Sequence, residues 1–250
     1  MIRGLYTAAS SMNVLAKKTN IRSNNLANVN TTGFKKSEGI TRSFPEMLLS
    51  RIEAGKPDQE IGELSTGAYL ENSFKDMSQG MLKQTGNNLD FAVEGEGFFV
   101  IETEAGQRYS RDGNFTINAD SELVTQSGNY VLDTAGERIQ LIPGQDFRVS
   151  TDGQITFNNG LQGAQIDLVN FQDEADLIQQ GDNLYAAQEG AEQIESQAAV
   201  VQGYLEGSNV KIVEEMAKMI KTTRHYESNQ KIISSIDESL NKIINEVGKA

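Results

Sequence analysis

The sequence predicts an α+β protein in which long N- and C-terminal helices form a discontinuous, coiled-coil-like helical domain around an inserted antiparallel β domain. Small and apolar residues recur at helical spacing in residues 1–28, and roughly forty residues before Gly248 contain neither Pro nor Gly. Between these ends, short runs rich in β-branched and aromatic residues alternate with turn pairs. Because helix comes first and last, the chain must leave the helical layer and return to it.

The first helix is predicted over residues 1–28. Its seam steps by three and four residues, which is how one helix meets another, through Leu5, Ala8, Met12, Leu15, Thr19 and Leu26. An Asn/Thr/Gly cluster ends the pattern. Asn side chains bond to nearby backbone and glycine accepts positive φ, so we expect Asn28, Gly33 and Phe34 to shape a sharp turn out of the helix.

The last helix is expected to begin with Ser208-Asn209 as its N-cap and with Glu214 and Glu215 near its first turn. Its apolar positions fall mostly on a four-three spacing: Ile212, Met216, Met219, Tyr226 and Ile233, then Ile236, Leu240, Ile243 and Val247. Such a helix cannot bury its seam against itself. The N-terminal helix is the first candidate for its partner, and other copies of the chain are the next.

The middle of the chain divides into a connector and a β domain. Residues 43–85 are punctuated by Pro and Gly, and Phe44–Leu49 is compatible with a short helix. Strands are predicted at Leu89–Val93, Phe98–Thr103, Arg108–Ser110, Asn114–Ile117, Tyr130–Leu132, Phe147–Val149, Ile155–Phe157, Ile166–Phe171 and Ala198–Leu205. The expected domains are a discontinuous helical assembly domain, 1–42 with 207–250, then a connector, 43–85, and a β-rich outer domain, 86–206.

Charge and composition exclude several functional classes. The net charge is −13, yet residues 1–42 carry seven Lys or Arg against one Glu, so the excess acid lies in the middle. An acidic middle argues against nucleic acid as a partner, since binding of the phosphate backbone needs clustered Lys and Arg side chains. Cysteine is absent, which excludes disulfides, Cys-ligated zinc and thiol catalysis. No run approaches 18 apolar residues and the N-terminus lacks signal-peptide features, so we expect no direct membrane insertion and no ordinary secretion.

Candidate chemical sites are few. His225 lies inside the last helix without a second ligand or base, and Gly95-Glu96-Gly97 precedes a strand rather than the helix that a phosphate loop requires. Oxygen ligands for calcium could come from alternating side chains at Asn118, Asp120 and Glu122. The segment lacks the turn glycine and the closing bidentate glutamate of a calcium-binding loop, so a polar turn is the better interpretation. We therefore expect no catalytic residue, no cofactor and no metal.

Three groups of motifs follow one another along the chain. The first is Asn25-Leu26-Ala27-Asn28 with Thr32-Gly33-Phe34-Lys35. The second runs from Gln79-Gly80, Leu82, Thr85 and Leu89-Asp90 through Gly95-Glu96-Gly97-Phe98-Phe99 to Tyr109 and Arg111-Asp112-Gly113-Asn114-Phe115. The third is Leu205-Glu206-Gly207-Ser208-Asn209-Val210 with Glu214-Glu215-Met216. Together, in this order, they resemble the bacterial flagellar basal-body rod proteins of the rod and hook axial family.

The resemblance implies a structural subunit, without catalytic role, that polymerises into the helical tubular drive shaft between motor and hook, with terminal helices inside and the β domain outside. It also implies location in the basal body, export by the flagellar type III apparatus, and other copies and neighbouring rod or hook proteins as partners. The expected assembly contacts are Leu5, Met12, Leu15, Leu26, Asn28, Gly33, Phe34, Ile212, Met216, Ile233, Ile236, Leu240 and Ile243.

Two alternatives stay open at this point. Hook subunits resemble the chain at both ends but usually carry a larger middle. An extracellular β-rich hydrolase would need a clustered pair of carboxylates in a deep cleft.

Overall fold

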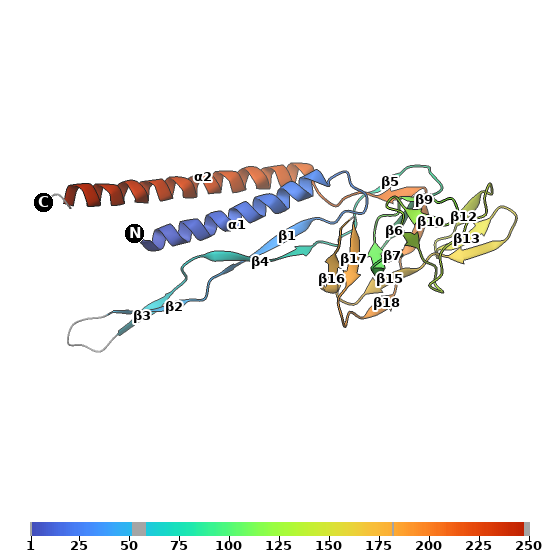
Figure 1. Ribbon diagram of the computed structural model, residues 1–250, viewed down its shortest axis with the longest axis horizontal. Coiled ribbons are helices and arrows are strands. Elements are labelled where there is room, and N and C mark those ends of the chain that lie inside the picture. The colour runs from blue at the N-terminus through green and yellow to red at the C-terminus, as the bar shows by residue number, and fades with distance from the viewer. Residues whose placement is uncertain (1, 52–58, 182, 248–250) are drawn as a thin grey trace. The chain divides into compact units, whose positions relative to one another are not determined.

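A computed structural model describes residues 2–51, 59–181 and 183–247 (Figure 1). The chain forms two compact units, each built from segments far apart in the sequence. Unit 1 combines Met1–Ala27, Ser37–Phe74 and Lys211–Ala250. Unit 2 combines Asn28–Lys36 with Lys75–Val210.

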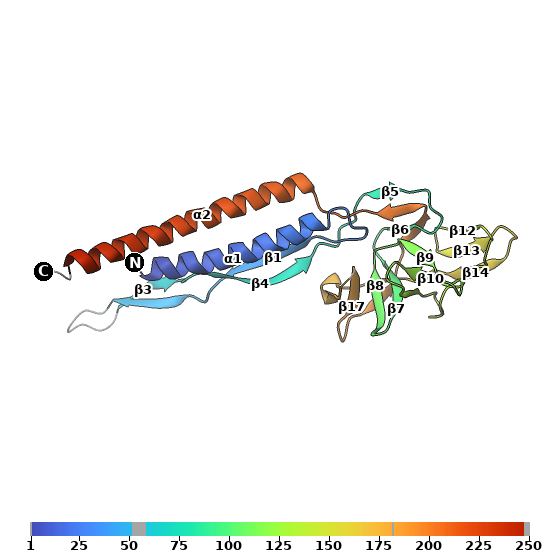
Figure 2. The ribbon, with the colours of Figure 1, turned by 45° about the horizontal axis from the view of Figure 1, so that its top comes forward.

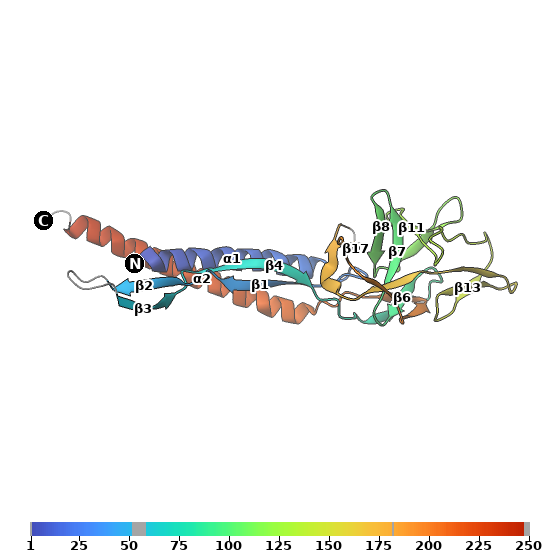
Figure 3. The same cartoon turned by 90° about the horizontal axis from the view of Figure 1, so that it is seen from below.

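Unit 1 has three layers. Helix α1 (Ile2–Ala27) lies between helix α2 (Ile212–Lys242) and a ribbon of strands β1 (Ser37–Ser43) and β4 (Ala68–Lys75), as Figures 1 and 2 show. A short π-helical segment, η2 (Ile243–Val247), extends α2. Strands β2 (Met47–Arg51) and β3 (Gln59–Leu64) form a second antiparallel pair, which follows β1 and β4 in Figure 3.

The predicted coiled-coil-like helical domain is wrong. In the residues that the structure describes there are two α-helices, and their compact unit also contains the four strands β1–β4. The short helix predicted at Phe44–Leu49 is wrong as well, because β2 pairs there with β3 and Met47 lies opposite Leu64. A short apolar run has no periodicity that separates helix from strand, so long-range pairing decides between them.

The two helices otherwise follow the sequence closely. Helix α1 spans Ile2–Ala27 and confirms the prediction over residues 1–28. Helix α2 begins later than expected, since its N-cap is Lys211, which makes no side-chain cap hydrogen bond. Glu214 and Glu215 occupy its first turn, as predicted, where carboxylates favour the positive end of the helix dipole.

Unit 2 is the inserted antiparallel β domain. Its main sheet in the described residues has nine strands, and seven of them follow the order β16-β17-β8-β7-β11-β10-β9. β15 pairs with both β7 and β18. The bounds are β7 Phe98–Thr103, β8 Gly106–Ser110, β9 Phe115–Ile117, β10 Leu123–Thr125, β11 Tyr130–Val131, β15 Leu168–Phe171, β16 Leu177–Gln179, β17 Leu184–Ala187 and β18 Gln193–Glu195.

Smaller antiparallel sheets complete unit 2. One has the order β12-β13-β14, and the others pair β6 with β19 and β5 with β20. Their bounds are β5 Leu82–Gln84, β6 Phe91–Glu94, β12 Phe147–Val149, β13 Gln154–Phe157, β14 Gln162–Gln165, β19 Ala199–Gln202 and β20 Tyr204–Glu206, with a 3-10 turn η1 at Glu174–Asp176.

Strand β7 lies between two apolar clusters. Phe99 and Ile101 join a cluster that includes Phe115, whereas Phe98 and Val100 join another. Side chains of a strand alternate between its faces, and both faces of β7 are buried, which explains its unbroken apolar run.

Candidate functional site

Four segments of unit 2 meet at one place, which we call the junction. They are Asn28–Lys36 after α1, the segment 76–80, the loop 111–114, and residues 204–209 around β20. Gly33 adopts φ of 65°, and its N–H donates to the carbonyl oxygen of Glu206 at 2.8 Å. The junction therefore joins residues from all three motif groups of the sequence.

Glu206 is the central residue of the junction. Its Oε1 accepts hydrogen bonds from Lys35 Nζ at 2.6 Å and from the Gly80 N–H at 2.7 Å. Its Oε2 lies 3.4 Å from Nη1 of Arg111. The side chains of Lys35, Arg111 and Glu206 are at most 1% exposed. One carboxylate thus holds two buried cations, which carry an uncompensated positive charge in this triad.

Burial dominates the electrostatics of this triad. Desolvation lowers the pKa of Lys35, and the charge and hydrogen bond of Glu206 oppose that shift. Burial lowers the pKa of Arg111 in the same way, again opposed by Glu206. The Arg111 guanidinium also lies 5.1 Å from the Phe98 ring centroid. The charged forms of both cations therefore depend on Glu206, and losing Glu206 leaves two buried positive charges without their partner.

A second layer of hydrogen bonds surrounds the triad. Asn209 Oδ1 accepts from the Lys36 N–H at 2.8 Å, and its Nδ2 donates to the carbonyl oxygen of Asp76 at 2.7 Å. The side chain predicted to cap α2 is thus engaged in the junction. On another side, Thr32 donates to Asp112 Oδ1 at 2.8 Å, and Asn183 Nδ2 donates to the Thr32 carbonyl at 2.9 Å.

Asp76 gives the junction a pH dependence that can be measured. Burial alone would raise the pKa of its carboxyl, but hydrogen bonds from Ser78 and the ion pair with Lys36 lower that pKa to about 2. The folded state then binds fewer protons than the unfolded state between pH ~4 and ~2, so the stabilisation is present above this window and lost as pH falls through it. For Asp76→Asn we expect lower urea midpoints than wild type near neutral pH and a difference that shrinks to a small fraction as pH falls to ~2. A difference that persists unchanged at pH ~2 would contradict this assignment.

The Glu206 carboxylate of the junction is paired with two buried cations. In the described part of the chain, no group of three His, Asp or Glu side chains is placed to hold a metal ion. His225 is exposed on α2. Asn118 bonds to the N–H groups of Asp120 and Glu122, which confirms the predicted polar turn.

The predicted assembly residues fall into three environments. Gly33 and Phe34 are buried in the junction, where Phe34 is 3% exposed, and Asn28 accepts from Thr31 Oγ1 at 3.2 Å within the turn. The residues that are partly buried are Leu5, Met12, Leu15 and Leu26 on α1 and Ile233, Ile236 and Leu240 on α2. Ile212, Met216 and Ile243 are exposed. The structure brings both partly buried sets into unit 1, and contacts between copies stay a prediction.

Polar residues that the apolar pattern missed hold α1 against α2. Glu215 and Thr222 are buried residues of α2. Arg22 Nη1 donates to the Lys218 carbonyl and to Thr222 Oγ1, and Asn229 Nδ2 donates to Ser11 Oγ at 2.9 Å. The seven-residue spacing from Glu215 through Thr222 to Asn229 and Ile236 could have revealed this face, had polar residues been counted with apolar ones.

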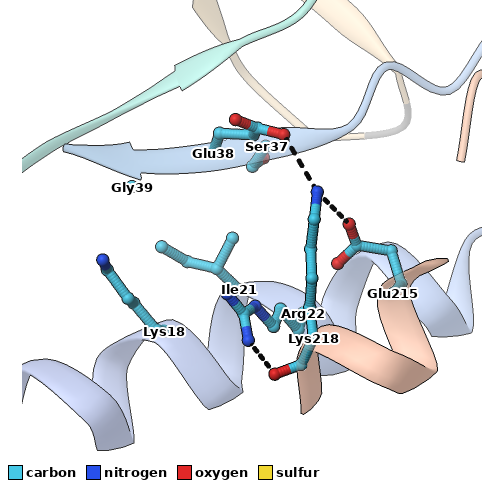
Figure 4. Close-up of a pocket in the computed structure, with 8 residues that line it drawn as sticks. All are labelled: Lys18, Ile21, Arg22, Ser37, Glu38, Gly39, Glu215 and Lys218. Carbon is cyan, nitrogen blue, oxygen red and sulfur yellow. Dashed lines mark hydrogen bonds and ion pairs between the residues drawn. The ribbon is translucent and has the colours of Figure 1, made fainter. Parts of the chain in front are cut away.

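A small pocket of about 190 Å³ lies beside Arg22 and Lys218 in unit 1, between α1, β1 and α2 (Figure 4). Lys218 Nζ lies 3.5 Å from Glu215 Oε1 and 3.6 Å from Glu38 Oε1. The hydrogen bond that Lys218 Nζ donates to the Glu214 carboxylate is the main reason that the pKa of Lys218 is raised. The acids and Lys218 satisfy one another across the pocket, so the arrangement ties the three layers together.

Comparison with known proteins identifies the family. Residues 5–35 match the family described as flagella basal body rod protein, residues 92–162 the D1 domain of flagellar hook protein FlgE/F/G, and residues 201–246 the C-terminal region of flagellar basal body rod FlgEFG protein. Each matched region contributes one member of the buried triad: Lys35, Arg111 and Glu206.

Full-length relatives agree with these matches. The flagellar basal-body rod protein FlgF of Caulobacter vibrioides is 35% identical over 253 residues, covering 100% of this chain and 99% of the relative. FlgG of Bacillus subtilis is 33% identical, covering 98% and 99%, and the hook-basal body complex protein FlhO of that organism is 35% identical over 100% of both chains. The chain therefore belongs to the flagellar basal-body rod protein family and is a structural subunit of the rod of the flagellar basal body.

Proposed function

We propose that this rod subunit assembles with further copies of itself and with neighbouring rod and hook proteins into a helical tube, through its terminal segments. The observation that carries the proposal is the composition of unit 1, where the N-terminal helix α1 packs against the C-terminal helix α2 and apolar side chains stay exposed on both α2 and the ribbon. Exposed apolar surface of this kind favours association. Residues 1–42 and 207–250 are the proposed assembly domain, 43–85 the connector and 86–206 the outer domain.

In this proposal the tube is the drive shaft that passes torque from motor to hook, and a central channel serves export. The subunit itself reaches the rod through the flagellar type III export apparatus. Its role is mechanical and not catalytic, which agrees with a junction whose buried carboxylate is already paired with two cations. No helix within the described ranges is long and apolar enough to cross a membrane.

A proline in α2 tests assembly through the terminal segments. Met219→Pro removes a helical hydrogen bond and clashes with the preceding turn, at a cost of about 3 kcal/mol to the helix. We expect the variant to be absent from isolated basal bodies and to fail to restore swimming in a strain without its own copy. Met219→Ala keeps the helical backbone and is the matched control, expected to enter basal bodies. Normal incorporation of the proline variant would refute assembly through these segments.

A further inference from the structure

We propose that two asparagine side chains, Asn25 and Asn209, clamp the backbone where the chain passes between its two units, and that torque travels from one unit to the other through this clamped backbone. The inference rests on the proposed role as a subunit of a drive shaft and deepens it by naming the residues that make the connection stiff. Asn25 stands in the first motif group of the sequence and Asn209 in the third.

The chain crosses between unit 1 and unit 2 four times. The crossings are the peptide links 27–28, 36–37, 74–75 and 210–211. Any force that the covalent chain passes from one unit to the other goes through these links. A link beside free backbone can act as a hinge, because a hinge is a few residues that absorb changes in φ and ψ. A stiff connection therefore needs the backbone beside the links to be held.

The Asn25 clamp holds the first two crossings on the unit 1 side. Asn25 Nδ2 donates to the Ser37 carbonyl oxygen at 2.9 Å, and Asn25 Oδ1 accepts from the Ser37 N–H at 2.9 Å. One side-chain amide thereby engages both backbone groups of Ser37, as a neighbouring strand would. Asn25 is 1% exposed, so water does not compete for these bonds. The last turn of α1 and the start of β1 are thus fixed to each other beside links 27–28 and 36–37.

The Asn209 clamp holds three crossings on the unit 2 side. Asn209 Oδ1 accepts from the Lys36 N–H at 2.8 Å, and its Nδ2 donates to the carbonyl oxygen of Asp76 at 2.7 Å. The same nitrogen lies 3.1 Å from the carbonyl oxygen of Ser78. Lys36 stands directly before link 36–37, Asp76 closely follows link 74–75, and Asn209 itself closely precedes link 210–211. One side chain therefore ties the backbone beside three of the four links.

Link 36–37 is held most completely. In unit 2 the Asp76 N–H donates to the Lys36 carbonyl oxygen at 3.0 Å, and Lys36 Nζ lies 3.0 Å from Asp76 Oδ2. With the bonds to the two asparagines, the N–H and the carbonyl oxygen of both Lys36 and Ser37 have partners. Rotation at this link would break hydrogen bonds in both units and leave backbone groups unpaired, which costs free energy.

The clamps are separate from the contacts that hold each unit together. Neither Asn25 nor Asn209 belongs to the two apolar clusters or to the buried triad of the junction. Alanine in place of either asparagine removes the clamp hydrogen bonds and leaves the residues of the clusters and the triad unchanged. We therefore expect such a variant to assemble, to turn normally against a small load, and to fail when the torque is high.

Rotation under two loads tests the clamps. A strain without its own copy expresses Asn25→Ala or Asn209→Ala, and beads of small or large diameter on shortened filaments set the load. We expect normal amounts of both variants in isolated basal bodies, normal rotation of small beads, and a several-fold smaller fraction of large beads that rotate. Asn118→Ala is the matched control, because Asn118 Oδ1 accepts from the N–H groups of Asp120 and Glu122 in a turn of unit 2 that contains no link. The control is expected to rotate both beads as wild type does.

Two outcomes would overturn the inference. Clamp variants that enter basal bodies and rotate large beads as well as Asn118→Ala does would show that the clamps do not stiffen the shaft. Asn209→Asp decides the case in which the alanine variants do not enter, since it keeps the size of the side chain and the acceptor for the Lys36 N–H but loses the donor to Asp76. We expect it to enter and to show the same loss at high load. Its absence as well would assign the clamps to folding or assembly instead. Failure of the proposed function would appear separately, as normal incorporation of Met219→Pro.

Discussion

Replacing Glu206 by glutamine is expected to lower the free energy of unfolding of unit 2 by about 3–5 kcal/mol, because Lys35 and Arg111 then remain buried without a counter-charge. Glutamine keeps the size of the side chain and an oxygen that can accept from the Gly80 N–H, so the loss reports mainly on charge. Urea unfolding followed by circular dichroism measures the effect.

Two further variants control this result. Glu102→Gln breaks the exposed pair with Arg138 and is expected to change the urea midpoint far less. Adding Lys35→Met to Glu206→Gln removes one of the two buried cations, so the double variant should recover part of the lost stability. If Glu206→Gln and Glu102→Gln unfold at the same midpoint, the triad does not stabilise the junction as argued.

The spacing of apolar residues predicts a helix or strand accurately where that local pattern agrees with the burial found in the fold. Helix α1 has a three-four pattern from Leu5 to Thr19, strand β7 has an apolar run bounded by turn residues, and the sequence predicts both nearly to the residue. The sequence does not predict strands β1–β4, because Pro and Gly punctuate the segment and β1 and β4 lack a regular alternation of buried and exposed residues. Strand β1 also packs against α1, a contact between distant segments that no local sequence window contains.

The charged residues of the junction show a different limit of prediction from sequence. Lys35, Arg111 and Glu206 stood in motifs that the sequence made visible, but their pairing joins positions 171 and 95 residues apart. Composition predicts that such side chains are solvated, since Lys, Arg and Glu are rarely fully buried unless paired. Only the fold brings these side chains together, and their pairing offsets part of the free energy that burying each charge costs.

The helix pair shows that a seam can be polar. Sequence analysis placed Ile212 and Met216 in the contact, yet both are exposed, while Glu215 and Thr222 are buried. Arg22 bonds to Thr222 and to the carbonyl of Lys218, so hydrogen bonds replace apolar contact at that end. Hydrophobicity alone therefore does not identify the side of the first turns of α2 that packs on α1 within the chain, and contacts between copies through Ile212 and Met216 stay a prediction.

Gly33→Ala is expected to destabilise unit 2 by about 3 kcal/mol or more. Positive φ costs an L-residue about 1–2 kcal/mol, and overpacking adds about 1–3 kcal/mol. Here the added Cβ would lie 2.5 Å from the backbone nitrogen of Asp112 and 2.7 Å from the carbonyl carbon of Arg111. Backbone atoms on both sides of the turn would have to move, and the hydrogen bond from Gly33 N–H to Glu206 would be disturbed with them.

Gly190→Ala is the matched control, because it separates steric conflict from backbone conformation. Gly190 has φ of 97°, which is further from the left-handed region that L-residues tolerate than the 65° of Gly33, and a Cβ there meets no atom within 4 Å. If conformation alone mattered, Gly190→Ala would be the more damaging change. We expect the opposite order in urea midpoints and in recovery of the variants from basal bodies, since only Gly33 is enclosed by the junction that joins the three motif groups.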